Sequence, residues 1–360
     1  MGKVDNIKTS LVSGKLLIFG GAGSLGHALV EYFRNHAEEI IVVSRDEAKH
    51  WDLKNKFGVK HIVQYKSPGS SYVKTHVSTL RTIVGDVRDA KRMSQIIRDE
   101  NPRHIIIAQA MKQVDTCEEQ PAEAVETNVL GVRNVLDAVK ENEVRPDNEI
   151  TDVCFVSTDK AASPINVYGM CKSISEKMVV AMSKRSNVNF VVTRYGNVVS
   201  SKGSIVPLFQ QQAKSKPCFT VTVPEMTRFM MLLEESVMLI DAAMNSGSSG
   251  TIWIPKLDSF RVGDMARYFS ERYAKPVDII GIRPGEKIHE ILYSETEDLN
   301  TKPTYNGYTL IDANHVPKNV SQKDYSSKDY VISYEELSSR LDQFLEKGHY
   351  VKNFRPNQSK

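Results

Sequence analysis

A cluster of chemically complementary side chains lies in one short segment near the middle of the chain. A carboxylate and an amine are adjacent at Asp159 and Lys160, and a phenol and a second amine follow at Tyr168 and Lys172. The i, i+4 spacing of Tyr168 and Lys172 lets one helix face present both groups. A phenol normally titrates near ~10, and a neighbouring ammonium lowers that pKa. We therefore expect Tyr168, assisted by Lys172, to take a proton from a hydroxyl group.

A strand and a helix must position these side chains. The run Val153 to Val156 is typical of a buried parallel strand. Residues 158–160 then follow its carboxyl end, where open α/β sheets bind ligands. Pro164 and Asn166 interrupt regular structure before the helix begins. The structural alternatives are an ordinary amphipathic helix for the phenol and its amine, and a loop ion pair for the acidic and basic neighbours.

A glycine-rich turn lies between a strand and a helix near the start of the chain. The strand is expected at Lys15 to Phe19, and the helix is expected to run through Phe33. In a dinucleotide-binding turn, Gly21 would permit the tight turn, Gly23 the approach of a pyrophosphate, and Gly26 the packing of helix on strand. The residues expected to contact the phosphates are Gly20, Gly21, Gly23, Ser24, Leu25 and Gly26.

The tip of the second strand indicates which dinucleotide is bound. The strand Ile40 to Val43 is followed by Ser44 and Arg45, with Lys49 one turn further on. Cations at this position suit a ribose 2′-phosphate, so these residues favour NADP over NAD. Asp46 leaves NAD open, and a solvated helix face is the alternative for Lys49.

Two further strands, Thr82 to Val84 and His104 to Ala108, are expected to end at the same edge. Asp86 at the first tip is placed to accept a hydrogen bond from an adenine amino group. Capping of a helix is the structural alternative for Asp86 or Asp89, and both roles can coexist. Small residues after the second tip would let a cofactor lie close. The remaining residues expected at the cofactor are Asp86, Val87, Ala108, Ala110 and Lys112, together with Tyr168 and Lys172.

The order of elements predicts an α/β fold. Strands and helices alternate as far as the strand Phe190 to Thr193, which predicts a doubly wound, mostly parallel Rossmann sheet. Beyond this point, glycines and prolines separate shorter elements. We therefore expect residues 1–196 to form a dinucleotide-binding Rossmann domain and residues 197–360 to form mainly a smaller α/β substrate-binding lobe. A strand at 251–255 should return to the main sheet.

Three other segments carry structural expectations. One helix is expected from Pro121 to Val139, with Asn128 bonding either to loops beneath the site or within the core. The segment from Asp52 to Arg81 contains a loop signal at 67–71 and has no functional interpretation. The final helix, Tyr334 to Lys347, has an apolar stripe suited to core or interface packing.

Composition limits the classes of partner. The chain has 360 residues, a net charge of +3 and four cysteines without paired spacing. These features predict a cytoplasmic protein with reduced thiols and without a metal site. The absence of a long basic run or an apolar run of ~20 residues argues against nucleic-acid and membrane partners.

These motifs resemble those of extended short-chain dehydrogenases/reductases. Within that group the chain resembles the inverting UDP-N-acetylglucosamine 4,6-dehydratases over roughly Lys15 to Leu292. One departure is Phe19, where many relatives have Thr, and the segment from Asp52 to Arg81 is longer than the family leads us to expect. The matching segments are 20–26, 44–47, 85–89, 157–161 with Tyr168 and Lys172, 194–198, 226–229 and 281–290.

The resemblance implies a mechanism. Tyr168 takes the proton of the sugar 4-hydroxyl while C-4 passes a hydride to tightly bound NADP, which is recycled in each turnover. Lys160, neutral because its pKa is depressed, removes the C-5 proton, and protonated Asp159 donates to the departing 6-hydroxyl. Hydride returns to C-6, and C-5 is protonated on the opposite face. The implied product is UDP-2-acetamido-2,6-dideoxy-β-L-arabino-hexos-4-ulose.

The resemblance also implies how the substrate is held. Thr158 would lie near the 4-hydroxyl, and Arg283 is either a ligand of the UDP group or part of a surface turn. The implied partner is UDP-N-acetylglucosamine, and the protein would be a homo-oligomer, either a dimer or a hexamer. The residues implied to contact the nucleotide sugar are Lys112, Asn197, Arg228, Arg283 and Glu286.

Two other functions compete with this interpretation. A nucleotide-sugar 4-epimerase needs Tyr168 and Lys172, but it does not need the elimination pair Asp159 and Lys160. A non-catalytic NADP-sensing protein would be expected to lack the tyrosine and lysine pair, which this chain retains.

Overall fold

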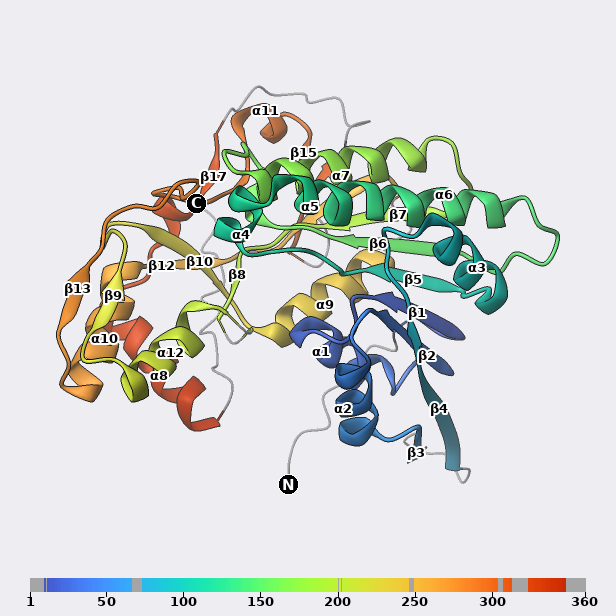
Figure 1. The fold of residues 1–360 in the computed structure, drawn as a ribbon, viewed down its shortest axis with the longest axis horizontal. Coiled ribbons are helices and arrows are strands. Elements are labelled where there is room, and N and C mark those ends of the chain that lie inside the picture. Colours follow the sequence, from blue (N-terminus) through green and yellow to red (C-terminus); the bar gives the residue numbers. More distant parts are fainter. Residues whose placement is uncertain are drawn as a thin grey trace.

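A sheet of ten strands forms the centre of the molecule (Figure 1). The computed structural model describes residue 10 and residues 12–66, 73–199, 201, 203–245, 249–303, 307–312 and 323–347. The strand order across the sheet is β15-β16-β11-β7-β6-β5-β1-β2-β4-β3. The sheet strands are β1 (Lys15–Phe19), β2 (Glu39–Ser44), β3 (Lys60–Lys66), β4 (Val73–Val84), β5 (His104–Ile107), β6 (Asp152–Val156), β7 (Asn189–Thr193), β11 (Thr251–Ile254), β15 (Thr301–Pro303) and β16 (Thr309–Asp312).

The central strands are parallel and almost completely buried. Neighbouring strands from β4 through β11 pair in parallel, whereas β3, β16 and β15 each pair antiparallel with a neighbour. All four residues of β5 are buried, as are the last four of β1 and β6. Continuous apolar runs form such strands because helices cover both faces of a parallel sheet. The doubly wound Rossmann sheet expected from the sequence is therefore confirmed.

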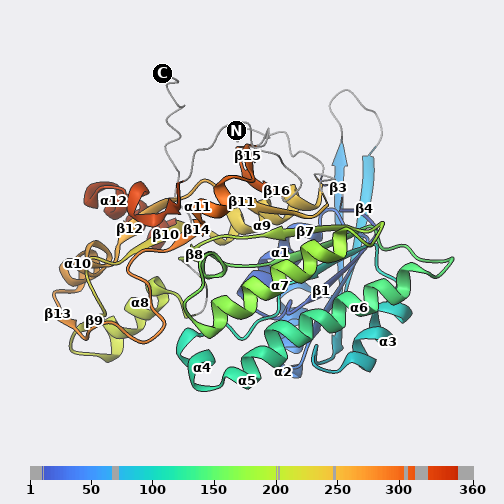
Figure 2. The ribbon, with the colours of Figure 1, turned by 90° about the horizontal axis from the view of Figure 1, so that it is seen from above.

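Helices form a layer on each side of the sheet. In Figures 1 and 2, α3, α5, α6 and α7 lie along one face, and α1, α2 and α9 lie along the other. None of the helices in the described ranges is long and apolar enough to cross a bilayer. The covering helices are α1 (Ser24–Phe33), α2 (Glu47–Phe57), α3 (Ala90–Glu100), α4 (Val114–Glu119), α5 (Pro121–Val125), α6 (Gly131–Glu143), α7 (Val167–Ser183) and α9 (Leu233–Met244).

A second hydrophobic cluster packs beside the carboxyl ends of the strands. The rings of Phe209, Phe219 and Phe269 lie 5.3–6.0 Å apart at its centre. Leu337 and Leu341 of the final helix are buried in the same cluster, so the expected apolar stripe packs into this core. The elements outside the main sheet are β8 (Asn197–Val198), α8 (Ile205–Ser215), β9 (Phe219–Val221), β10 (Thr227–Met231), β12 (Asp258–Arg261), α10 (Val262–Tyr273), β13 (Val277–Ile279), β14 (Ile291–Tyr293), α11 (Glu295–Asp298), β17 (Tyr325–Ser326) and α12 (Tyr334–Lys347).

The chain after Asn197 contributes to both parts of the molecule. The expected returning strand is confirmed, because β11 pairs in parallel with β7. The antiparallel strands β16 and β15 then extend the main sheet, which the sequence did not indicate. A domain boundary near residue 197 stays a prediction.

Two elements differ from the sequence-based expectation. The single helix expected from Pro121 to Val139 is divided by a π-helical turn, Glu126–Leu130, into α5 and α6. The strand expected at Thr82 to Val84 begins at Val73 and forms a hairpin with β3. The loop signal at 67–71 lies outside the described residues.

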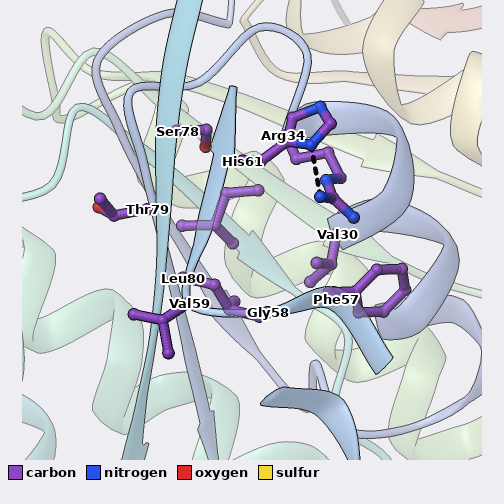
Figure 3. A pocket seen from close by; sticks show the side chains of 10 residues that line it. Val30, Arg34, Phe57, Gly58, Val59, His61, Ser78, Thr79 and Leu80 are labelled. Carbon is purple, nitrogen blue, oxygen red and sulfur yellow. Dashed lines mark hydrogen bonds between the residues drawn. The ribbon is translucent and has the colours of Figure 1, made fainter. Parts of the chain in front are cut away.

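The β3–β4 hairpin borders a small pocket against α1 and α2 (Figure 3). The side chains of Arg34 and His61 are hydrogen-bonded across it. Its volume of about 10 Å³ is comparable with a single water site, and none of the expected site residues lines it. The pocket is therefore too small to hold a nucleotide or a sugar.

The glycine turn after β1 depends on close backbone contacts. Gly20 has φ +81°, and a Cβ there would lie 2.5 Å from the backbone nitrogen of Gln109. The expectation that Gly21 provides the tight turn is wrong, because the left-handed residue is Gly20. A Cβ on Gly21 would instead meet Val42 at 2.9 Å. The expected packing role of Gly26 agrees with the structure, because a Cβ there would lie 2.0 Å from the carbonyl oxygen of Gly21.

We predict that Gly26→Ala lowers the free energy of unfolding by about 3 kcal/mol or more, because α1 must move away from the turn. Gly23→Ala is the matched control. A Cβ on Gly23 would meet only the Gly20 carbonyl oxygen at 3.7 Å, so the Ala variant should lose only the small preference for Gly at a helix N-cap, about 1 kcal/mol or less. Chemical denaturation measures both. Equal stability of the two variants would contradict this packing role.

Candidate active site

The central segment runs from β6 into α7 at the carboxyl edge of the sheet. Thr158 Oγ1 donates a hydrogen bond of 2.9 Å to Asp159 Oδ1 and accepts one from the backbone N–H of Lys160. A single 3-10 turn, Asp159–Ala161, follows. Asn166 then caps α7 by accepting a 2.8 Å hydrogen bond from Gly169 N–H. The structure therefore brings the adjacent acid and amine to the edge where the sequence placed them.

Lys160 lies between two buried carboxylates. Its Nζ is 3.2 Å from Asp159 Oδ1 and 3.0 Å from Glu290 Oε1. Arg228 Nε approaches the same Glu290 oxygen at 3.8 Å. Asp159 and Glu290 are 1% and 2% exposed. Asp159 Oδ2 and Glu290 Oε2 have no hydrogen-bond partner among the described residues, so each carboxyl group retains an oxygen that can bind a ligand.

The charges of this cluster differ in part from expectation. Burial raises the pKa of Asp159, in agreement with the protonated acid expected there. Burial alone would lower the pKa of Lys160, but the carboxylates of Asp159 and Glu290 together raise it above its ordinary value. The expectation of a neutral Lys160 is therefore wrong for this structure. The loop ion pair named as the alternative is present.

Glu290 was not identified as a site residue from the sequence. It belongs to the late run at 281–290 that carries part of the family resemblance, and this was the available signal. Burial would raise the pKa of Glu290, but Lys160 and Arg228 outweigh that effect and lower it. Arg228, expected at the UDP group, is instead in contact with the acid–base cluster.

Tyr168 and Lys172 are both buried on α7. Burial raises the pKa of Tyr168 to about 12, and the nearby cation that opposes this is Lys160. Lys172 Nζ donates a 2.7 Å hydrogen bond to Val156 O and lies 4.4 Å from the centre of the Phe155 ring. Burial lowers the pKa of Lys172 to about 7. The expectation that Lys172 lowers the pKa of Tyr168 is therefore not met in this structure.

The loop at residues 281–290, called the late loop below, is hydrogen-bonded to the central segment, residues 157–172. Asn166 Nδ2 donates a 2.8 Å hydrogen bond to Gly285 O, and Lys287 Nζ donates a 2.8 Å bond to Ala162 O. Arg283 is largely exposed and is paired with Glu286. The structure thus brings this loop beside the active segment, although the Arg283 side chain occupies a surface turn.

Several buried polar atoms without hydrogen-bond partners among the described residues lie along the carboxyl edge of the sheet. The Ser157 hydroxyl, the Asn197 Oδ1 atom and both amide atoms of Gln109 are buried without partners among the described residues. The N-terminus of α1, at Gly23, carries no side-chain cap in this described segment. Buried polar groups of this kind are normally hydrogen-bonded. These groups therefore fit a polar ligand lying along the strand ends.

The tip of β2 carries the expected cations. Arg45 is mostly exposed and lies 3.8 Å from Asp86 Oδ2, and Lys49 pairs with Asp46 at 2.6 Å. Ser44 Oγ is hydrogen-bonded to His50 Nε2 at 2.7 Å. Both cations are able to reach a phosphate group. Elsewhere at this edge, the helix cap is Asp89, whereas Asp86 accepts hydrogen bonds from Arg88.

The Asn128 side chain supports the loop that follows β5. Asn128 forms two 2.8 Å hydrogen bonds with the backbone of Met111, so its amide is satisfied and also supports the loop. Both sequence-based alternatives for Asn128 therefore hold. Lys112 follows Met111 at the surface, and partial desolvation lowers its pKa. Val87, Ala108 and Ala110 lie at the ends of β4 and β5, as expected.

Comparisons with known proteins agree on one group. Residues 16–312 match a family model described as polysaccharide biosynthesis protein. A protein of Rickettsia rickettsii named UDP-glucose 4-epimerase is 38% identical over 292 residues, which cover 78% of each chain. The X-ray structure of Pen from Bacillus thuringiensis is 28% identical, with a TM-score of 0.78, covering 92% of this chain and 97% of that one. The dTDP-glucose 4,6-dehydratase of Streptomyces venezuelae, solved with NAD and TYD bound, shares the fold at 18% identity, with a TM-score of 0.63 and coverage of 92% and 97%.

We predict a pH-dependent stability effect at Lys172. Between its folded pKa of about 7 and its ordinary value of 10.5, the unfolded chain binds a proton that the folded chain does not. Burial of Lys172 therefore destabilises the fold fully below pH 7, and this cost fades as the pH rises. Lys172→Met should have a higher free energy of unfolding than wild type at pH 7. This difference should shrink by up to about 1.4 kcal/mol per pH unit toward pH 10.

Denaturation at pH 7, 8 and 9 measures this difference. Lys177→Met, at an exposed position on the same helix, is the control and should give a difference that stays constant with pH. A pH-independent difference for Lys172→Met would contradict burial of an uncharged amine.

Proposed function

The chain belongs to the polysaccharide biosynthesis protein family, a group of extended short-chain dehydrogenases/reductases that modify nucleotide sugars, and from this premise we propose that it is an inverting UDP-N-acetylglucosamine 4,6-dehydratase. The proposed reaction oxidises C-4, eliminates water across C-5 and C-6, reduces C-6 and inverts C-5. Its product is UDP-2-acetamido-2,6-dideoxy-β-L-arabino-hexos-4-ulose, an early intermediate in deoxyamino-sugar biosynthesis.

One observation carries the proposal. A buried carboxylic acid and an amine lie side by side at Asp159 and Lys160, 3.2 Å apart, on the segment that leads to Tyr168. Elimination of water needs one group to take a proton from carbon and another to give a proton to the leaving oxygen. A simple oxidation and reduction at C-4 needs only the phenol. The second acid–base pair therefore supports a dehydratase.

The residues at the strand ends suit NADP as the cofactor. The uncapped α1 N-terminus and the turn at Gly20 suit its pyrophosphate, and Arg45 and Lys49 suit a ribose 2′-phosphate. Gln109, just after β5, supplies two unsatisfied polar atoms for the remainder of the molecule. Bound there, NADP supplies reversible hydride transfer and, in its oxidised form, a positive ring that favours the phenolate of Tyr168.

The chain's own groups perform the proton transfers. Tyr168 accepts the 4-hydroxyl proton as C-4 is oxidised, and Thr158 orients that hydroxyl group. The resulting ketone acidifies the C-5 proton, which Lys160 removes. Asp159, protonated because it is buried, donates to the 6-hydroxyl as water leaves. A proton from solvent then adds to C-5 on the opposite face, which inverts that centre.

The nucleotide end of the substrate is proposed to bind beside the late loop. Asn197, Arg283 and Glu286 are the residues proposed for the UDP group, with Lys112 at the edge of the cofactor. Arg228 is proposed to act there as well, and its 3.8 Å contact with Glu290 supports a position between the UDP group and the acid–base cluster. Assembly into a dimer or hexamer remains a proposal.

A nucleotide-sugar 4-epimerase is the second candidate. The Rickettsia relative at 38% identity carries the name UDP-glucose 4-epimerase, and this observation favours it. An epimerase would use Tyr168 and would leave Asp159 and Lys160 without a chemical role.

The product formed in deuterated water distinguishes the two candidates. With UDP-N-acetylglucosamine, we predict by NMR a 4-keto-6-deoxy sugar that carries deuterium at C-5 in the inverted configuration. Reduced cofactor should not accumulate, because the hydride returns in each cycle. Formation of UDP-N-acetylgalactosamine, without deuterium at C-5, would establish the epimerase instead.

Removal of the proposed base tests its role directly. We predict that Lys160→Ala forms no 6-deoxy product while it still binds NADP, because the C-5 proton has no acceptor. Tyr168→Phe is the matched comparison. It should lose both the 6-deoxy product and the transfer of hydride from C-4 to NADP. Turnover of Lys160→Ala at the wild-type rate would rule out Lys160 as the base.

A further inference from the structure

We propose that Glu290 is the positioning residue for Lys160, holding its ammonium while the site is open and taking up its proton when Lys160 must act as a base. This inference rests on the proposed dehydratase function and deepens it. It answers a difficulty in the site, namely that a charged ammonium cannot remove a proton from carbon.

Contact geometry is the first support. Glu290 Oε1 lies 3.0 Å from Lys160 Nζ, a distance at which a proton passes directly between the two atoms. Glu290 Oε2 is buried without a partner among the described residues, so no further hydrogen bond stabilises the carboxylate charge there. A buried ion pair of this kind recovers its desolvation cost only when its remaining lone pairs are satisfied. Neutralising the pair by proton transfer therefore becomes favourable when a bound sugar excludes water.

The backbone of Glu290 is held rigidly. Its N–H donates a 2.9 Å hydrogen bond to Ser327 Oγ, and its carbonyl oxygen accepts one of 2.9 Å from Ser327 N–H. The Ser327 hydroxyl is also bonded to Thr227 Oγ1 at 2.6 Å, which ties this point to β10. The preceding residue, His289, is bonded to the same Thr227 hydroxyl. The carboxylate is thus fixed opposite Lys160 rather than carried on a free loop.

In the open site the surrounding charges hold Lys160 as an ammonium and Glu290 as a carboxylate, so the proton transfer requires the loss of water when the sugar binds. Lys160 and Asp159 face Glu290 from the 3-10 turn, Arg228 from β10, and Lys287 from its own loop. Burial raises the pKa of Asp159, and the proposed reaction uses Asp159 in its protonated form, so it has no free position for the proton of Lys160. Glu290 is the remaining carboxylate within contact of the Lys160 amine among the described residues.

The proposed step conserves atoms and charge. One N–H bond of the Lys160 ammonium breaks as an O–H bond forms on Glu290 Oε1, which leaves a neutral amine and a neutral carboxylic acid. The amine then takes the C-5 proton, and the C–H electron pair forms the C-5/C-6 double bond. The C-6–O bond breaks, and the oxygen leaves as water with the proton of Asp159. Lys160 is again an ammonium. Glu290 then returns its proton to solvent, and Asp159, left as a carboxylate, regains a proton from solvent before the next cycle.

Glu290→Gln tests this route through the pH dependence of turnover. The variant keeps the size of the side chain but cannot accept a proton. We expect kcat to fall about 10²-fold at pH 7, with KM little changed, and to recover as the pH rises, because Lys160 then loses its proton to solvent. Glu290→Asp, which retains the carboxylate, should recover part of the activity at pH 7.

A second readout does not depend on turnover. The rate at which an amine-directed acylating reagent modifies Lys160, followed against pH by peptide mass spectrometry, reports its ionisation. In Glu290→Gln, Lys160 should react at lower pH than in wild type, because the carboxylate that stabilises its ammonium is gone. Glu297→Gln is the matched control, because Glu297 is a largely buried carboxylate paired with Arg194 at 2.9 Å, not with Lys160. This control should lose stability and keep the wild-type pH profile.

The outcomes separate the two levels of the proposal. Wild-type formation of an epimer would remove the dehydratase and with it this role for Glu290. A wild-type dehydratase whose Glu290→Gln variant loses activity equally at every pH, or keeps full activity, would overturn the inference alone. An unchanged reactivity profile of Lys160 in the folded variant would overturn it as well.

Discussion

The pairing of one buried ammonium with two buried carboxyl groups constrains the whole site. Lys160 is mostly withdrawn from water, and a charge in that position must be paired to be tolerated. Its partners come from different parts of the chain, because Asp159 precedes it directly while Glu290 arrives with the late loop. The loop is in turn fastened to the central segment through Asn166 and Lys287. The reaction centre therefore exists only when the Rossmann sheet and the later elements are assembled together.

A second buried cation reinforces this assembly. Arg194, at the end of β7, is 1% exposed and is paired with Glu176 of α7 and Glu297 of α11. It also donates a 2.9 Å hydrogen bond to Leu292 O in β14. Removing one member would leave an unpaired buried charge, which costs about 3–5 kcal/mol. Arg194 thus fixes the segment that follows Glu290 to α7, the helix that carries Tyr168.

Sequence patterns predict the first half of this molecule well. Continuous apolar runs such as Leu16–Phe19 and the glycine turn before α1 have local signals, so their positions follow from neighbouring residues alone. The antiparallel strands β15 and β16 are short, and their place in the sheet is set by pairing with β11. No local periodicity contains that information.

The ionisation of the site could not be predicted for a related reason. The types and spacing of Tyr168 and Lys172 correctly indicate one helix face, but the pKa of each group depends on burial and on distant charges. Lys160 was expected to be neutral through burial and a nearby cation. Its contact with Glu290, which is remote in sequence, is a property of the fold and reverses that expectation. Glu290 itself lies in a run with recognisable motif residues, yet only the 3.0 Å contact gives it a role.

A crystal structure of the complex with NADP and UDP-N-acetylglucosamine would test the central claim most directly. The account predicts the C-4 hydroxyl beside Tyr168, the C-6 hydroxyl beside Asp159 Oδ2, and the C-5 hydrogen facing Lys160, whose amine remains in contact with Glu290. A sugar bound with C-5 and C-6 turned away from Asp159 and Lys160, and only C-4 at the phenol, would contradict it.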